Sequence, residues 1–189
     1  MARIDPDQPI AGVVVATPAV HRDERGCFVE TYRRSWIPGS REMVQANRAD
    51  RAAGCVVGLH YHRHQADYWY VPAGRARVVL HDLRAGAPTD GATMVLDLGA
   101  AAEPGGAHDH RGLYIPPGVA HGFAALSDMT ITYLVDGYHD PADELGVAWD
   151  DPAVAADWGV AEPVLSARDR ANPRRDQLDP ALRPRAGDA

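Results

Sequence analysis

The sequence lacks the features of a secreted, membrane-spanning or nucleic-acid-binding protein. Cysteine occurs only twice, at Cys27 and Cys55, which is too few for a disulfide framework, so we expect both to be buried small apolar side chains. No apolar run approaches the roughly 18 residues of a membrane span, and residues 1–7 do not resemble a signal peptide. The net charge of -7 disfavours nucleic acid, because phosphate contacts need clustered basic side chains. These absences predict a cytoplasmic protein whose partner is a small molecule.

The chain length and the order of its segments predict one all-β domain. A chain of 189 residues can bury a sizeable core, and we expect a single domain at 1–178 with a flexible tail at 179–189. Short β-branched and aromatic segments recur about every ten residues between glycines and prolines, which is typical of a sandwich or barrel. We favour a jelly-roll barrel with short peripheral helices. The expected strands are 10–17, 27–32, 45–47, 55–61, 68–71, 75–84, 93–98, 112–115, 121–126 and 129–135.

Three other segments have weaker signals. A helical turn is expected near Glu42 and a short helix at 151–158, where two aspartates and a proline form a start signal. Residues 99–111 are rich in alanine, glycine and histidine, which predicts a loop.

Residues 54–74 are the most informative stretch, because His60, His62 and Asp67 lie there in one short span between two glycines. Side chains two apart in a strand share a face, so His60 and His62 can point the same way. The order of residues resembles the first motif of the cupin superfamily, and residues 116–121, Pro-x-Gly-x-x-His, resemble the second. The departures are Asp67 in place of glutamate, His110 in place of glycine and Ala125 in place of asparagine.

The cupin resemblance implies a possible metal site. Three imidazoles and one carboxylate inside a β-barrel suit a divalent transition metal such as Fe, Mn, Ni, Cu or Zn, with positions left open for substrate. The four candidate ligands are His60, His62, Asp67 and His121, and His64 can replace His62 or support a ligand from outside. The alternative is a histidine-rich strand that faces solvent.

Over residues 10–178 the chain also resembles one cupin branch, the dTDP-4-dehydrorhamnose 3,5-epimerase family. The matching segments keep the family's order along the chain, and they are 23–32, 44–47, 58–61, 82–84, 87–89, 115–123, Tyr133, Tyr138, Pro141, Glu144, 149–152 and 165–169.

This resemblance implies a homodimeric isomerase, free of cofactors, that epimerises a dTDP-4-keto-6-deoxyhexose-like sugar in specialised metabolism such as antibiotic biosynthesis. The ketone acidifies hydrogens on the adjacent carbons, so a base can form an enolate and an acid can return a proton to the other face. By resemblance His60 is the base, Asp169 orients it and Tyr133 is the acid. Further residues match pocket positions of the family or replace its pocket residues: Arg25, Glu30, Gln45, Asn47, His121, Tyr138 and His139.

Four departures from the family weaken this assignment. Val57 stands where the family usually has arginine, Asp67 where it has lysine, His62 where it often has glutamine, and His139 where it has a second tyrosine. Losing two cations disfavours a nucleotide diphosphate and an enolate in one pocket, so we do not expect an ordinary rhamnose-pathway enzyme.

The epimerase and metal interpretations conflict at His60, because an imidazole that ligates a metal cannot use the same lone pair as a base. Three hypotheses remain. The first is a metal-free ketosugar epimerase. The second is a metal-dependent cupin isomerase, lyase or oxygenase, and the third is a non-catalytic small-molecule-binding cupin. We place the epimerase first, because the resemblance extends over nearly the whole chain.

Overall fold

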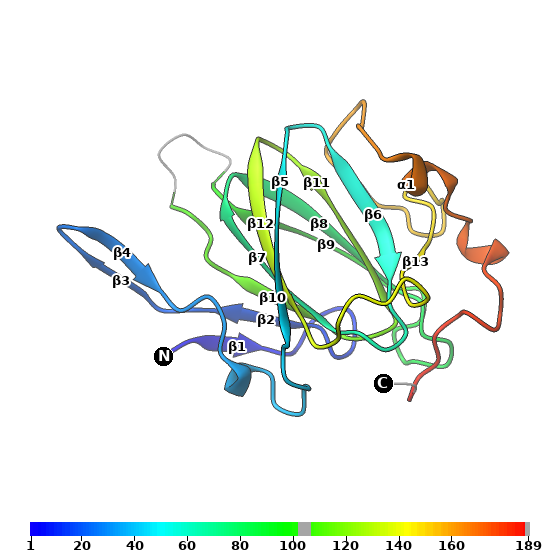
Figure 1. Cartoon of the computed structure of the whole chain (residues 1–189), viewed down its shortest axis with the longest axis horizontal. Coiled ribbons are helices and arrows are strands. Elements are labelled where there is room, and N and C mark those ends of the chain that lie inside the picture. The colour runs from blue at the N-terminus through cyan, green and yellow to red at the C-terminus, as the bar shows by residue number, and fades with distance from the viewer. Residues whose placement is uncertain (102–106, 188–189) are drawn as a thin grey trace.

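The computed structural model describes residues 1–101 and 107–187, and it consists mainly of two antiparallel sheets that face each other (Figure 1). The six-stranded sheet has the order β1 (Arg3–Asp5), β2 (Val14–Thr17), β10 (Gly112–Ile115), β7 (Asp67–Ala73), β12 (Met129–Val135) and β5 (Gln45–Arg51). The five-stranded sheet has the order β13 (Leu145–Gly146), β6 (Val56–Tyr61), β11 (Val119–Ala125), β8 (Arg75–Asp82) and β9 (Thr93–Gly99). The predicted all-β class is confirmed.

Short peripheral elements complete the fold. They are a separate hairpin of β3 (Val20–Asp23) and β4 (Gly26–Val29), the helix α1 (Ala167–Ala171) and two 3₁₀ turns, η1 (Arg34–Trp36) and η2 (Arg175–Gln177). The hairpin extends away from the two sheets (Figure 1).

The core lies between the two sheets, where β-branched and aromatic side chains meet. Val78 and Leu80 of β8 are fully buried against Leu113 of β10 and Ile131 of β12. Each sheet buries the face that is turned towards the other sheet, because its apolar side chains are removed from water there. Some residues of this core also line the polar pocket described below.

The path of the chain places the two halves of the histidine-rich stretch on opposite sheets. β5 lies in the first sheet, β6 in the second and β7 in the first again, and β10, β11 and β12 alternate in the same way. Residues close in sequence, such as His60 and Asp67, therefore project from facing walls. Residues far apart, such as His60 and His121, are directly paired neighbours on one wall.

Two helix predictions are wrong. Near Glu42 the structure has no helix, and the nearest helical turn is η1, which buries Trp36. At 151–158 the chain makes a single turn that ends at Ala155, whose φ of 49° is left-handed and cannot continue a right-handed helix. The α-helix lies instead at Ala167–Ala171, where Ser166 caps the backbone N–H of Asp169.

Several other predictions concern the ends and surface of the chain. Cys27 is exposed on β4 and Cys55 is only partly buried, so the prediction of two buried cysteines is wrong. In the predicted tail, Arg183 pairs with Asp90 and Arg185 bridges to Ala85, while residues 188–189 lie outside the described residues; the tail's flexibility stays a prediction. Part of the predicted loop, 102–106, is also outside them. In the described residues, no helix has the length and apolarity to span a membrane.

Candidate active site

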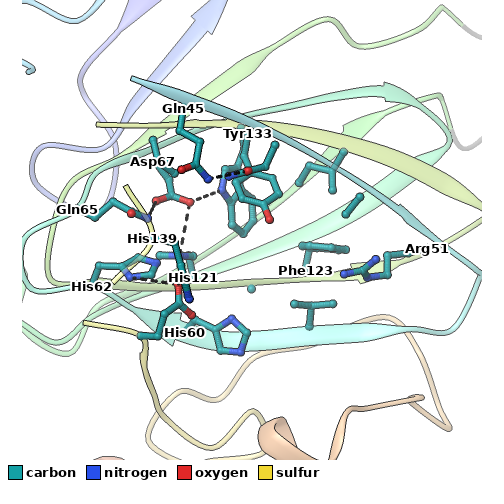
Figure 2. Close-up of a pocket in the computed structure, with 18 of the residues that line it drawn as sticks. Gln45, Arg51, His60, His62, Gln65, Asp67, His121, Phe123, Tyr133 and His139 are labelled. Carbon is teal, nitrogen blue, oxygen red and sulfur yellow. Dashed lines mark hydrogen bonds and ion pairs between the residues drawn. The ribbon is translucent and has the colours of Figure 1, made fainter. Parts of the chain in front are cut away.

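A cavity of about 410 Å³ opens between the two sheets, a size suited to a small-molecule ligand. Figure 2 shows polar side chains from both walls pointing into it. The lining residues come from β5, β6, β7, β11, β12, α1 and the connecting loops: Gln45, Asn47, Ala49, Arg51, Val57, His60, His62, Gln65, Asp67, Trp69, His121, Gly122, Phe123, Ile131, Tyr133, Val135, His139, Glu144 and Arg168.

His60, on β6, is hydrogen-bonded to a buried carboxylate that comes from the opposite end of the chain. Its Nε2 lies 2.6 Å from Oδ1 of Asp169, which is only 3% exposed. Oδ2 of Asp169 accepts a hydrogen bond from the Ser166 hydroxyl. Burial alone would raise the pKa of Asp169, but the hydrogen bonds from His60 and Ser166 outweigh it and hold that pKa below its ordinary value. The carboxylate can only accept, so Nε2 of His60 donates and Nδ1 of the neutral ring keeps the lone pair.

A second polar group, separate from His60, is formed by His62, Asp67 and His121. All three are buried, and their potential ligand atoms lie within 4.8 Å of one another. Nδ1 of His62 lies 2.9 Å from the carbonyl oxygen of Asp143, and Nδ1 of His121 lies 2.9 Å from that of Val119. Carbonyls only accept, so both rings carry their hydrogen on Nδ1. Burial lowers the pKa of His121 to about 4, so its Nε2 keeps a lone pair at neutral pH.

The carboxylate of this group is held on both oxygens. Oδ1 of Asp67 accepts from the amide of Gln65 at 3.0 Å, and Oδ2 accepts from the indole N–H of Trp69 at 3.0 Å. Nε2 of His121 lies 4.0 Å from Oδ2. Figure 2 shows Gln65, Asp67 and His121 on the side of the pocket away from Arg51.

Tyr133 enters the pocket from β12, in the sheet opposite to His60. It is paired in register with Asn47 of β5 and Trp69 of β7. Burial, and then the negative charge of Asp67, raise the pKa of Tyr133. The phenol is therefore protonated at neutral pH and can donate a proton.

The structure brings most of the sequence-predicted site residues together. His60, His62, Asp67, His121, Tyr133, Gln45, Asn47 and His139 line the same pocket, and Asp169 lies directly behind His60.

Four candidates lie elsewhere. Arg25, whose side chain is 83% exposed, sits at the tip of the β3–β4 hairpin, and Glu30 follows β4. Tyr138 is 75% exposed and does not line the pocket, and His64 is also exposed.

Sequence reasoning missed Arg51, Glu144 and Arg168 as lining residues. Arg51 was detectable, because alternate positions of β5 face the pocket and Gln45, Asn47, Ala49 and Arg51 share that period of two. The pairing of Arg168 with the Glu144 carboxylate, 3.0 Å between Nη1 and Oε2, carries no comparable local signal, because it joins α1 to a loop 24 residues away along the chain.

Residues 7–177 match the model of the dTDP-4-dehydrorhamnose 3,5-epimerase family. A Neisseria gonorrhoeae protein of that name is 33% identical over 172 residues, 87% of this chain, and the chain spans 50% of that relative's length. The solved structure of NovW, a 4-keto-6-deoxy sugar epimerase from the novobiocin biosynthetic gene cluster of Streptomyces spheroides, has a TM-score of 0.90 at 33% identity, covering 100% of this chain and 95% of its own.

A second solved structure supports the same fold. RmlC from Legionella pneumophila, in complex with dTDP-4-keto-L-rhamnose, has a TM-score of 0.88 at 31% identity and covers 98% of this chain and 99% of its own. Both superpositions confirm the predicted cupin-like fold.

Proposed function

The chain belongs to the dTDP-4-dehydrorhamnose 3,5-epimerase family, and on that premise we propose that its pocket epimerises a dTDP-linked 4-keto-6-deoxyhexose by proton transfer. It is an enzyme of the isomerase class, as its relatives are. The observation that carries the assignment of roles is that His60 and Tyr133 enter one pocket from opposite sheets. A sugar ring between them would meet a base on one face and an acid on the other.

The chemistry follows from the contacts of these two side chains. Nδ1 of His60 removes the proton from a carbon next to the C4 ketone, and the electron pair of the broken C–H bond forms the enolate. The ionised Asp169 stabilises the resulting imidazolium through its hydrogen bond to Nε2. The hydroxyl of Tyr133 then donates its proton to the same carbon from the other face. Solvent takes the proton from His60 and returns one to the tyrosinate, so atoms and charge balance.

The test of this function is deuterium exchange. The purified protein is incubated in D₂O with a dTDP-4-keto-6-deoxyhexose, and the product is examined by NMR and mass spectrometry. We expect deuterium at an epimerised carbon next to the ketone. A substrate that is recovered without deuterium at C3 and C5 would contradict the proposal.

Arg51 supplies a positive charge for the diphosphate that Val57 cannot. Its side chain lies at the end of the pocket away from Asp67 (Figure 2), and its Nη1 donates a hydrogen bond to the backbone carbonyl of Asp50 at 2.8 Å. Within residues 1–101 and 107–187 the guanidinium forms no salt bridge with a carboxylate, although the charge of Asp50 lies near enough to interact with it. The substrate would lie with its ketosugar at His60 and its diphosphate towards Arg51.

Replacing Arg51 with alanine should raise KM for the dTDP-sugar about 10- to 100-fold with a smaller effect on kcat, because a charge-assisted hydrogen bond is worth about 1.5–3 kcal/mol. Steady-state kinetics measures this. The matched control is Arg48→Ala, on the same strand but exposed and paired with Asp50, which should leave KM unchanged. Equal KM values for the two variants would remove Arg51 from the diphosphate site.

The protein acts as a homodimer in which the β3–β4 hairpin of one chain reaches the pocket of the other. The hairpin is a two-stranded ribbon outside both sheets, and such ribbons are only marginally stable alone. It exposes Phe28 (66%) and Val20 (37%), apolar surface that a second chain would cover. Arg25 and Glu30 match pocket positions of the family, yet neither lines the pocket of its own chain.

Mixed dimers test this arrangement. His60→Asn and Arg25→Ala chains should each form weakly active homodimers. A heterodimer of the two, isolated through different tags, should recover about half of the wild-type activity, because one of its two pockets then holds both His60 and Arg25. A heterodimer with only the mean activity of its parents would show that Arg25 does not cross to the partner.

A further inference from the structure

We infer that His62, Asp67 and His121 form a binding site for one divalent transition-metal ion, beside the His60–Asp169 pair and independent of it. The ligand set predicted from the sequence also included His60. The structure turns Nε2 of His60 towards Asp169 instead, so the group comprises only the other three. The competition between base and ligand at His60 therefore disappears.

The donor atoms are prepared as metal ligands are. Each histidine donates through Nδ1 to a backbone carbonyl, which fixes the ring and leaves Nε2 with its lone pair. Metal-ligating histidines almost always have such a partner on the other nitrogen. The Asp67 carboxylate is oriented by Gln65 and Trp69 in the same manner. Two histidines and one carboxylate, with other positions open, are the set used by non-haem iron and by catalytic zinc.

The charge of Asp67 provides a second argument. Asp67 is only 4% exposed, and its contacts in the described part of the chain are two neutral hydrogen-bond donors and His121 at 4.0 Å. Burying a carboxylate without a cation is costly, and a bound ion would neutralise it. Ligand atoms about 2.1 Å from one metal lie roughly 3 Å apart, so binding would draw Asp67 and His121 together.

The composition of the chain indicates what the ion would do. All 19 basic residues are arginine, so the sequence contains no lysine. Asp67 occupies the place where the family resemblance implies a lysine near the enolate. A metal held there would restore positive charge at the same end of the pocket and stabilise the enolate oxygen. This role rests on the proposed epimerase function, whereas the binding site does not.

Metal binding is measured directly. Protein made without a histidine tag is stripped with a chelator and dialysed in separate experiments against Zn²⁺, Ni²⁺ or, without oxygen, Fe²⁺, and bound metal is counted by elemental analysis. We expect one equivalent per chain for at least one ion. His62→Gln, Asp67→Asn and His121→Gln should each weaken binding about 100-fold or more. His60→Asn, in the same pocket, and His64→Gln, exposed beside it, should retain the full equivalent.

Circular dichroism of each variant separates loss of a ligand from loss of folding, and the near-isosteric Asp67→Asn is the decisive variant. A wild type that binds none of the three ions, or an Asp67→Asn variant that binds as well as wild type, overturns the site. The group would then be two neutral histidines beside a buried carboxylate that holds no metal ion.

The catalytic role has a separate readout. Deuterium exchange that stops on chelation and returns with the ion supports it, and exchange that survives complete removal of metal overturns it. A protein that binds one equivalent at these residues but exchanges no deuterium would contradict the proposed epimerase function and leave the metal site standing.

Discussion

Replacing His60 with asparagine is expected to lower kcat about 10³-fold or more and to abolish incorporation of solvent deuterium into the ketosugar. A positioned general base contributes typically 10²–10⁴-fold, and His60 also gives the proton its route to solvent. Asparagine is close in size and polar but cannot take up a proton near neutral pH. Because the side chain is partly exposed at the pocket, the substitution should leave the fold intact.

The comparison that isolates the base is between His60→Asn and His64→Asn. His64 is exposed and lies outside the pocket, so its variant should exchange deuterium at the wild-type rate. Binding of dTDP by both variants, measured by calorimetry, should match wild type, because the proposed arrangement places the sugar and not the nucleotide at His60. A His60→Asn enzyme that still incorporates deuterium at a comparable rate would assign the base to another residue.

Replacing Asp169 with asparagine is expected to lower kcat about 10²-fold or more while KM changes little. Asp169 does not line the pocket but lies behind His60, 2.6 Å from Nε2, so it acts through His60 and not on the substrate. The amide loses the negative charge that stabilises the imidazolium, and it can turn its N–H₂ towards the ring and favour the wrong tautomer. The same exchange in a Ser-His-Asp triad costs about 10⁴-fold.

The pH dependence gives this prediction a second measurement. Hydrogen bonds from His60 and Ser166 lower the pKa of Asp169 against its burial. The pKa of Asp169 is lower in the folded state than in the unfolded state. Its ionised carboxylate therefore stabilises the fold fully at pH values above the unfolded-state pKa, and this stabilisation is lost as the pH falls through the folded-state pKa. Asp169 is therefore ionised throughout pH 6 to 8. Its own titration should add no pH dependence to the ratio of the kcat of wild type to that of Asp169→Asn in this range. Asp176→Asn, an exposed carboxylate, is the matched control, and a loss of similar size there would indicate a general effect of charge.

Much of the fold was predictable from local patterns. The segments at 112–115 and 129–135 are strands with the expected bounds, because short apolar runs bounded by turn residues are local properties of the chain. The two helix predictions failed because local start signals do not show where a helix ends or whether it is stabilised. The segment 151–158 has a start signal, but its turn ends at Ala155 in a left-handed conformation. The short helix α1 is capped by Ser166, and it carries Asp169, which contacts His60.

The sequence by itself determined the family, the residue types at the site and the face that each strand presents, because strand periodicity and motif order are local. Only the tertiary structure decided which side chains are partners. Asp169, 109 residues from His60 along the chain, is the carboxylate that binds it, while Asp67, seven residues away, joins His62 and His121. The strands that carry these residues, β5 to β7 and β10 to β12, alternate between the facing sheets along the chain. Distance along the sequence therefore does not predict distance across the pocket. Which polar side chains become partners depends on which of them the fold buries together, because a buried polar group needs a partner.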